Sequence, residues 1–351
     1  SYLYGLNKVK HRVFKKLLTL IALIGIFAAA GAGALAWWVH QPLNLAFSTV
    51  EFTLDKANTA ASGKTVAQQV VEAGVQTQPA LLQLWFRLSG DARKIKAGSY
   101  ELEAGVTPRS LLKKLVSGDQ AFKTITLVEG WTFNQLREAL SKAEHLKQET
   151  RGLKPEVIME KLGKPGLKPE GRFFPDTYTY TKGNSDWVVL KSAMQAMNKN
   201  LEAAWEMRAK DSPLKSMDDA LTLASIVEKE TGSKADRDMV GSVFNNRLRI
   251  NMPLQTDPTV TYGVGTAVGK EYDGNWLRAK ADDNPWNTYQ RTGLPPTPIA
   301  MPGKAALLAA VQPKPSSALY FVAKGDGTGA SQFSHTLEEH NRAVNKYIRG
   351  K

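Results

Sequence analysis

LTLASIVEKETG, residues 221–232, is the stretch that decides the fold of the larger part of this chain. Its apolar residues recur with helical spacing, and Ser216 and Asp219 upstream have the spacing of a capping box, so we expect a helix that ends at the final glycine. Glu228 and Glu230 interrupt its apolar end. A carboxylate beside a core is costly unless it is paired, hydrogen-bonded or kept for chemistry.

The two glutamates are two positions apart, which turns their side chains about 200° apart on a helix. We therefore expect them to serve different sites. One interpretation is that each forms an ion pair with a lysine or arginine at the rim of the core. The other is that one of them is a general acid, because apolar surroundings raise the pKa of a glutamate toward neutral pH.

The sequence after this helix favours chemistry. Residues 251–303 are dense in Pro, Gly, Asn, Thr and Tyr, and long irregular stretches of this kind in a compact domain are often functional. Amide, carboxylate and hydroxyl groups can hydrogen-bond a sugar, and rings such as Trp286 can stack on its faces. We expect five residues to bind sugar or orient the acid: Gln255, Asp257, Asn287, Tyr289 and Tyr262. The alternative is loop architecture, since Asp257 precedes a proline and Asn287 can cap a helix.

The N-terminus indicates the compartment. A basic tail, residues 1–16, precedes the uncharged stretch LLTLIALIGIFAAAGAGALAWWV (17–39), whose 23 residues would span roughly 34 Å as a helix. Basic residues on the N-terminal side place that end in the cytoplasm and the remainder of the chain outside it. A cleaved signal peptide is the alternative, with AGALA as its small residues. The length of the run and its two tryptophans favour an uncleaved anchor in the inner (cytoplasmic) membrane.

The rest of the chain predicts an α+β fold in two parts after a linker at 40–47. Residues 48–118 read as a small β-α-α-β-α subdomain: strand 48–57, helices within 62–75 and 79–90, strand 95–105 and helix 107–118. Residues 123–351 read as a mixed α/β domain: a strand and helix in 123–140, a loop at 161–171, a helix at 234–250, a strand at 318–324 and a closing helix at 336–350.

Composition excludes several kinds of site. There is no cysteine, which excludes disulfides, thiolate nucleophiles and Cys-ligated zinc, and the five histidines show no HExxH spacing. We expect no metal and no cofactor. The net charge of +13 indicates either an anionic partner or a lysine-rich surface with a basic membrane end. We expect the lysine-rich surface and no nucleic-acid partner. The sequence has no long basic run outside the N-terminus, and it shows no signature of a nucleic-acid-binding module.

Several motifs together resemble the YceG-like family, the MltG-type endolytic murein transglycosylases. They extend across residues 123–345, and their order and combination are more specific than any one of them. The motifs are EGRFFPDTY (170–178), LASIVEKET (223–231), VFNNRL (243–248), LQTDPTVTYG (254–263), NTY…GLPPTPIAMPG (287–303), YFVA (320–323) and TLEEHN (336–341).

The resemblance implies a reaction. It is non-hydrolytic cleavage of MurNAc–GlcNAc bonds inside nascent peptidoglycan strands, which leaves 1,6-anhydro-MurNAc ends. The first glutamate of EKET, Glu228, would be its acid and base. The substrate's acetamido group would stabilise the cationic centre, so that no second carboxylate is required. The family further implies a LysM-like character for 48–118, glycan strands and the membrane as partners, and peptidoglycan synthases, the penicillin-binding proteins, as candidate partners.

One position departs from the family pattern. Where the family often has a histidine two residues before the Phe of its last motif, this chain has Ser331, and a histidine, His335, lies two residues after Phe333. This puts any role of that histidine in doubt but not the role of Glu228. His340 and Asn341 match, and a structural role is expected for His340.

Two other functions stay open from the sequence. One is a membrane-anchored peptidoglycan-binding adaptor without turnover. The other is a hydrolytic muramidase, which would need a second carboxylate facing Glu228, and Asp257 is the candidate that we expect for it.

Overall fold

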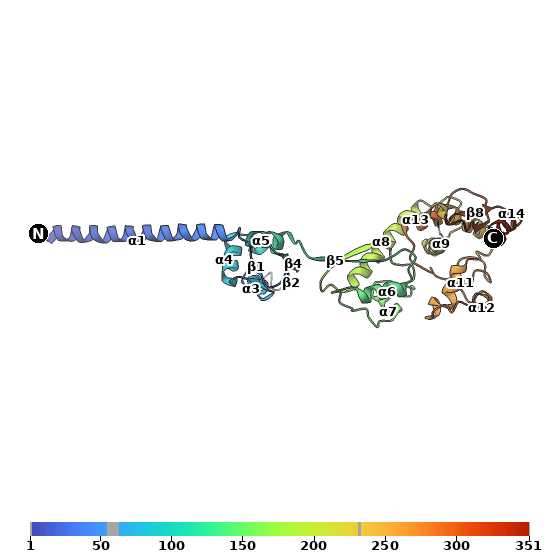
Figure 1. Cartoon of the computed structure of the whole chain (residues 1–351), viewed down its shortest axis with the longest axis horizontal. Coiled ribbons are helices and arrows are strands. Elements are labelled where there is room, and N and C mark those ends of the chain that lie inside the picture. Colours follow the sequence, from blue (N-terminus) through green and yellow to red (C-terminus); the bar gives the residue numbers. More distant parts are fainter. Residues whose placement is uncertain (1, 55–62, 231–232, 351) are drawn as a thin grey trace. The chain divides into compact units, whose positions relative to one another are not determined.

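The structure is a computed structural model that describes residues 2–54, 63–230 and 233–350. The chain divides into two compact units, with the boundary between Phe122 and Lys123 (Figure 1). Helices are combined with two-stranded sheets throughout, which confirms the α+β class. The expected end of the first strand (55–57) and the expected end of the glutamate helix (Gly232) lie outside the described residues.

A long helix, α1 (Tyr2–Trp38), opens the first unit (Figure 1). Its section Leu18–Trp38 has 21 residues, and within the described residues it is the one helix long and apolar enough to cross a membrane. Its side chains are exposed, as Phe27 shows at 74%. A core helix of a soluble protein would bury them, so this section is consistent with a single-pass membrane anchor.

The small part of the first unit contains the five predicted elements in the predicted order, with two short strands added. Alternating residues of β2 turn inward, and in the antiparallel β2–β4 pair Val50 lies opposite Leu102 and Phe52 opposite Tyr100. The elements are β1 (Asn44–Leu45), β2 (Thr49–Leu54), α3 (Gly63–Glu72), β3 (Val75–Gln76), α4 (Pro79–Leu88), the 3₁₀ turn η1 (Ala92–Lys94), β4 (Gly98–Glu103) and α5 (Pro108–Ser117). Its likeness to LysM stays a prediction.

Helix α5 shows how local sequence sets these boundaries. The Thr107 hydroxyl accepts a hydrogen bond from the Ser110 amide at 3.1 Å, in a capping box, and Pro108 occupies the first helical position. The helix ends at Gly118, whose φ of 76° is left-handed. The helix expected at 107–118 is thus confirmed.

The predicted linker at 40–47 is wrong in part, because much of it is built into the small domain. Val39 and Leu43 are buried, and the Leu43 amide donates to the Val106 carbonyl at 2.7 Å. β1 pairs antiparallel with β3. An apolar valine and leucine cannot remain in a solvated linker when a core lies beside them, so the end of α1 is joined stiffly to the first folded unit.

The second unit is mainly helical. Its elements are β5 (Phe122–Thr126), α6 (Phe133–Lys142), α7 (Pro155–Lys161), β6 (Thr177–Thr181), α8 (Trp187–Glu206), α9 (Met217–Glu230), η2 (Lys234–Asp236), α10 (Arg237–Arg249), α11 (Asp257–Val264), η3 (Thr266–Val268), α12 (Trp276–Ala281), α13 (Lys304–Val311), β7 (Tyr320–Ala323), β8 (Ser331–Ser334), α14 (Leu337–Val344) and a π-helical turn (Asn345–Arg349). β5 pairs with β6, and β7 pairs antiparallel with β8.

Helix α9 is the centre of the second unit. Every residue from Ala220 to Val227 is buried, and α8, α10 and α13 pack around it. The Ser216 hydroxyl accepts from the Asp219 amide at 3.1 Å as expected, but the Asp219 carboxylate accepts from Lys215 rather than from Ser216. A helix that is enclosed on all sides holds the backbone of its last turn in place, and that turn carries Glu228.

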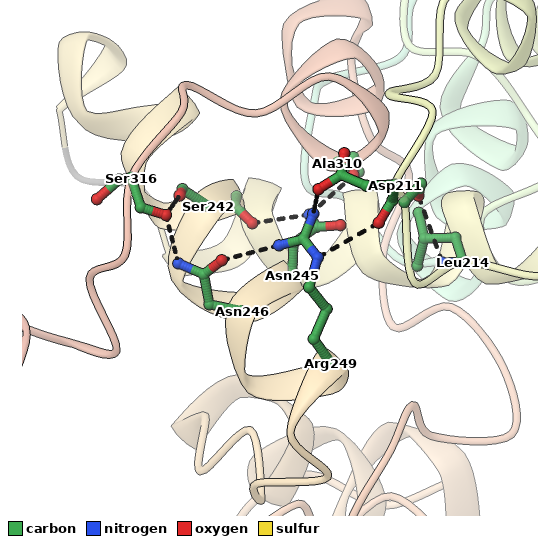
Figure 2. A network of polar contacts seen from close by, with 10 residues as sticks. Asp211, Leu214, Ser242, Asn245, Asn246, Arg249, Ala310 and Ser316 are labelled. Carbon is green, nitrogen blue, oxygen red and sulfur yellow. Dashed lines mark hydrogen bonds and ion pairs between the residues drawn. The ribbon is translucent and has the colours of Figure 1, made fainter.

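Polar side chains on α10 fix the neighbouring segments (Figure 2). The Asn245 amide donates to the Ala310 carbonyl of α13 at 3.0 Å, and Asn246 donates to the Ser316 carbonyl at 2.8 Å. Arg249 donates to Asp211 at 2.9 Å and to Asn246. The asparagines of the motif VFNNRL are therefore scaffolding: they join α10 to α13 and to the loop that leads into β7.

Candidate active site

Glu228 lies on the last turn of α9 with its side chain 6% exposed. One carboxylate oxygen, Oε1, accepts from Arg237 Nη2 at 3.1 Å, and the other, Oε2, accepts from the Gly303 amide at 2.9 Å. Arg237 begins α10 and is 7% exposed. Its Nε is buried and has no hydrogen-bond partner among the described residues.

The surroundings of Glu228 act in opposite directions on its pKa. Burial raises the pKa most, because the charged form loses water. The Gly303 amide and the positive charge of Arg237 lower it, and the negative charge of Glu129 raises it again. The net direction is upward. The ion-pair interpretation of this glutamate is confirmed. The raised pKa is compatible with the general-acid interpretation, which stays a prediction.

Glu129 is the second carboxylate at this site. It lies in the turn after β5, is exposed, and covers Gly303 so closely that a methyl group added there would collide with it. The next residue, Gly130, has a φ of 79°, and its amide donates to the Met301 carbonyl at 2.8 Å. Lys229 reaches the Gly130 carbonyl at 3.5 Å. The sequence predicted the strand and the helix on either side of this turn, but it gave no sign that the turn lies beside Glu228.

The segment 297–303 delivers the Gly303 amide, and hydrogen bonds pin it along its length. Thr297 accepts from Trp286 Nε1 at 3.0 Å, and the Ile299 amide donates to the buried hydroxyl of Ser225 on α9 at 3.0 Å. The Met301 amide donates to the Trp131 carbonyl at 2.7 Å. Prolines within the segment restrict its backbone further. Its final amide therefore reaches Glu228 without a loop having to order first.

Glu170 is a buried carboxylate that was not predicted from the sequence. It is connected to the segment 297–303 through Tyr262, which is hydrogen-bonded to both Glu170 and Thr297. It is 5% exposed and accepts from the Phe133 amide at 2.8 Å, from the Tyr262 hydroxyl at 3.0 Å and from the Gly171 amide. Burial is the largest influence and raises its pKa to about 7. Its place in the motif EGRFFPDTY was visible, but its burial was not.

Tyr262 connects Glu170 to the aromatic part of this region. Its ring packs against Trp286 with centroids 5.8 Å apart, and its hydroxyl is also hydrogen-bonded to Thr297. Burial raises the Tyr262 pKa well above its usual value, so the phenol stays protonated and donates to Glu170. The contact between the two rings covers part of the aromatic surface that a sugar could stack on.

Glu230 belongs to a different cluster, as the helical geometry predicted. Its carboxylate accepts from the Thr256 hydroxyl, and burial raises its pKa, with a further rise from the charge of Asp257. Asp257, the first residue of α11, accepts from the Tyr289 hydroxyl at 2.6 Å. Burial, together with Asp257, raises the Tyr289 pKa.

The five predicted binding residues thus fall into separate groups. One group, near Glu230, contains Gln255, Asp257 and Tyr289. Gln255 is exposed, has a φ of 51°, and its backbone N–H donates to the Thr288 carbonyl. Tyr262 lies with Glu170. Within the described residues, no hydrogen bond joins any of the five to Glu228.

Asn287 is buried inside its own loop. Its side-chain amide donates to the Lys280 and Asp282 carbonyls at the end of α12, and its Oδ1 accepts from the Tyr289 amide at 3.0 Å. This arrangement agrees with the alternative that Asn287 is part of the loop architecture. Through the Tyr289 amide, Asn287 also fixes the backbone of Tyr289.

The histidines near the C-terminus lie apart from this site's polar contacts. His335 shares a hydrogen bond with Ser317 at 2.9 Å, and the amide of Ser331 donates to Asp236. The His340 ring stacks on Tyr320 with centroids 5.2 Å apart, and burial lowers its pKa. Its Nδ1 is buried and has no hydrogen-bond partner among the described residues, so the structural role of His340 stays a prediction.

Comparison with known proteins gives consistent results. A profile of the YceG-like family matches residues 56–346. The endolytic murein transglycosylase of Bacillus subtilis is 35% identical over 277 residues, which cover 74% of this chain and 75% of that protein. The enzyme of the same name from Streptococcus pneumoniae strain D39 is 27% identical over 296 residues, 73% of this chain and 51% of that one.

A solved structure agrees with the sequence comparison. The crystal structure of a YceG-like protein from Listeria monocytogenes is 27% identical, matches 84% of this chain and 98% of its own, and superposes with a TM-score of 0.51. Because the family profile spans most of the chain, including Glu228, Arg237 and Gly303, this chain belongs to the YceG-like family.

Proposed function

We propose that this chain is an endolytic murein transglycosylase, like the relatives named above, and that Glu228 is its general acid and base. It is an enzyme of the lytic transglycosylase class. The observation that carries the residue assignment is the environment of Glu228: burial raises its pKa, whereas Arg237 and the Gly303 amide lower it. A group that must both give and take a proton works best with a pKa near the working pH, and these opposing influences are how a protein sets one.

The chemistry uses this one side chain twice. Protonated Glu228 gives its proton to the oxygen of the MurNAc–GlcNAc bond, and the bond from MurNAc C1 to that oxygen breaks. The substrate's acetamido group shares the positive charge at C1. Glu228, now a carboxylate, takes the proton of the C6 hydroxyl as O6 bonds to C1, which closes the 1,6-anhydro ring. Arg237 and the Gly303 amide stabilise the carboxylate between the two transfers.

Asp257 and Tyr289, which lie near Glu230, are proposed to bind sugar units of the strand away from the bond that Glu228 cleaves, together with Gln255 and Tyr262. Asn287 is proposed to position Tyr289. Asp257→Asn and Tyr289→Phe should raise KM more than they lower kcat, because binding groups act in ground and transition states alike. Equal losses in kcat and kcat/KM would assign these residues to the chemical step instead.

A hydrolytic muramidase is the second candidate, and one observation favours it. Glu129 is close enough for its charge to raise the Glu228 pKa, and an inverting hydrolase needs a second carboxylate to activate water. Asp257, the residue expected for this role, is paired with Tyr289 and acts on Glu230 instead. Glu129 is therefore the residue through which hydrolysis would have to proceed.

Mass spectrometry of uncrosslinked glycan strands separates the candidates. The wild-type chain, Glu228→Gln, Glu129→Gln and Glu230→Gln are compared, the last as the matched change on the same helix. We expect anhydro-ended fragments from all but Glu228→Gln, which should lose about 10²- to 10⁴-fold in rate. Products heavier by one water, lost in Glu129→Gln, would make the chain a hydrolase. If the membrane-reconstituted wild-type chain gives no product, the result favours the peptidoglycan-binding adaptor without turnover.

We also propose that α1 anchors the chain in the inner membrane, with the N-terminus in the cytoplasm and both folded units outside. The apolar section follows Lys15 and Lys16 directly, which supports this orientation. Since the chain lacks cysteine, single cysteines added on each side can be probed in intact cells with a membrane-impermeant thiol reagent. Labelling of the cysteine on the N-terminal side would show that the topology is the reverse of the one proposed. Glycan binding by the small domain and contact with peptidoglycan synthases stay predictions.

A further inference from the structure

An apolar hollow lies between the end of α1 and helix α4 of the small domain. Leu81, Leu84 and Leu88 line it from α4, and the last two turns of α1, Gly31–Trp38, line it from the other side. Leu84 is 45% exposed and Leu88 63%. These leucines recur at helical spacing on one face of α4, so that face is apolar and unpartnered while the opposite face packs Leu82 and Phe86 into the core.

The hollow has a fixed shape because α1 and the small domain are joined without slack. The Arg109 amide at the start of α5 donates to the Val39 carbonyl at 3.1 Å, and the Arg109 guanidinium is hydrogen-bonded to His40 at 2.9 Å. Trp38 packs against the core of the domain, and Val39 is 3% exposed. Whatever places α1 therefore also places α4.

The length of the apolar section fixes the depth of α4. The 21 residues of Leu18–Trp38 measure about 31 Å as a helix, which matches the roughly 30 Å hydrocarbon core of a bilayer. The part before the hollow, residues 18–30, measures only about 20 Å and cannot cross alone. The turns that face α4 are thus needed to complete the span. Tilting α1 would shorten its reach and draw α4 deeper still.

We propose that α4 is a second membrane contact, in which the lipids of the outer leaflet cover Leu81, Leu84 and Leu88. The stretch of α1 beside the hollow, Gly31–Trp38, covers about 12 Å, and interfacial helices bury their apolar face to a similar depth of about 5–10 Å. Arg87, exposed between the two outer leucines, has a side chain long enough to reach lipid phosphates from there. The inference rests on the proposed anchoring of α1, and it adds that the first folded unit lies against the membrane surface.

Depth-dependent quenching in vesicles tests this contact. The full chain has no cysteine, so Leu84→Cys and Leu88→Cys can each carry one environment-sensitive fluorophore. The labelled chains are reconstituted in phosphatidylcholine–phosphatidylglycerol vesicles that carry a nitroxide either on the upper part of the acyl chain or near its end. Phe27→Cys, within the apolar section, is the positive control. Ser117→Cys is the matched control in the same domain, at the end of α5 away from its junction with α1.

We expect blue-shifted emission at both α4 positions and at Phe27→Cys. The upper nitroxide should quench the α4 positions more strongly, and the deeper nitroxide should quench Phe27→Cys more strongly. Ser117→Cys should show neither the blue shift nor the quenching. Quenching at Phe27→Cys but at neither α4 position would overturn the inference and leave the anchor intact. Without quenching at Phe27→Cys, the anchor fails and the inference fails with it. Efficient disulfide-linked dimers of unlabelled Leu84→Cys, together with unquenched labels, would show that a second copy covers this face, which also overturns the inference.

Discussion

Replacing Glu170 by glutamine should remove a specific part of the pH dependence of folding. Burial raises the pKa of this carboxyl from its ordinary 4.5 to about 7 in the folded chain. The folded state therefore binds the proton more tightly than the unfolded state does. Its contribution to stability is complete below about pH 4.5, declines as the pH rises through about 7, and is gone above that.

The magnitude follows from the two values. At about 1.4 kcal/mol for each pKa unit, the difference between 4.5 and about 7 corresponds to roughly 3 kcal/mol of unfolding free energy. Glutamine resembles the protonated acid, since it can accept from the Phe133 amide and donate to Tyr262. Relative to the wild type, Glu170→Gln should thus gain about 3 kcal/mol between pH 4.5 and pH 8.

Urea unfolding of the detergent-solubilised full chain, followed by tryptophan fluorescence across this pH range, measures the difference. Every other titrating group is common to both proteins and cancels in the comparison. Glu138→Gln is the control, because Glu138 is exposed on α6 and its nearest charge is Lys142 at 2.6 Å. Parallel stability profiles of wild type and Glu170→Gln would refute the reasoning and show that Glu170 is ionised throughout.

Three further predictions concern other parts of the structure. Arg237→Gln removes a charge that lowers the Glu228 pKa, so the alkaline fall in kcat/KM should move to higher pH; an unmoved profile would mean that Arg237 does not tune this acid. Gly241→Ala should lower thermal stability by about 1–3 kcal/mol despite alanine's better helix propensity, because its methyl group would collide with the Ala309 carbonyl oxygen; an increase in Tm would contradict this packing. Thr107→Ala should cost about 1 kcal/mol through loss of the α5 cap, whereas Thr107→Ser should be nearly neutral in the same denaturation assay.

Local sequence patterns predicted most of the elements because local physics sets them. Helix α5 begins and ends where its own residues dictate, at Thr107 and Pro108 and at Gly118. The alternation of buried and exposed residues in β2 follows from a sheet with one buried face. The linker prediction failed at Leu43 for the opposite reason. Nothing beside that residue in the sequence shows that Val106 and a core lie next to it.

The same division applies to the site. The helical pattern marked both Glu228 and Glu230 as unusual carboxylates at an apolar helix end, and the helical angle correctly separated them. The resemblance to the family, and not the pattern, selected Glu228. Its partner Gly303 lies 75 residues away, and Glu129 approaches from a turn before α6. Such meetings depend on packing of distant segments, which a single sequence does not display. Glu170 was missed similarly, because only burial makes its carboxyl unusual.

The use of one glutamate twice has a consequence for the supply of protons. In the proposed cycle, the proton that Glu228 gives to the glycosidic oxygen is replaced by the proton of the C6 hydroxyl, so each cut leaves Glu228 protonated again. The reaction as a whole therefore neither consumes nor releases a proton. Arg237 and the Gly303 amide, which stabilise the carboxylate between the two transfers, are already in contact with it. Successive cuts should therefore need no buffer molecule as a proton donor.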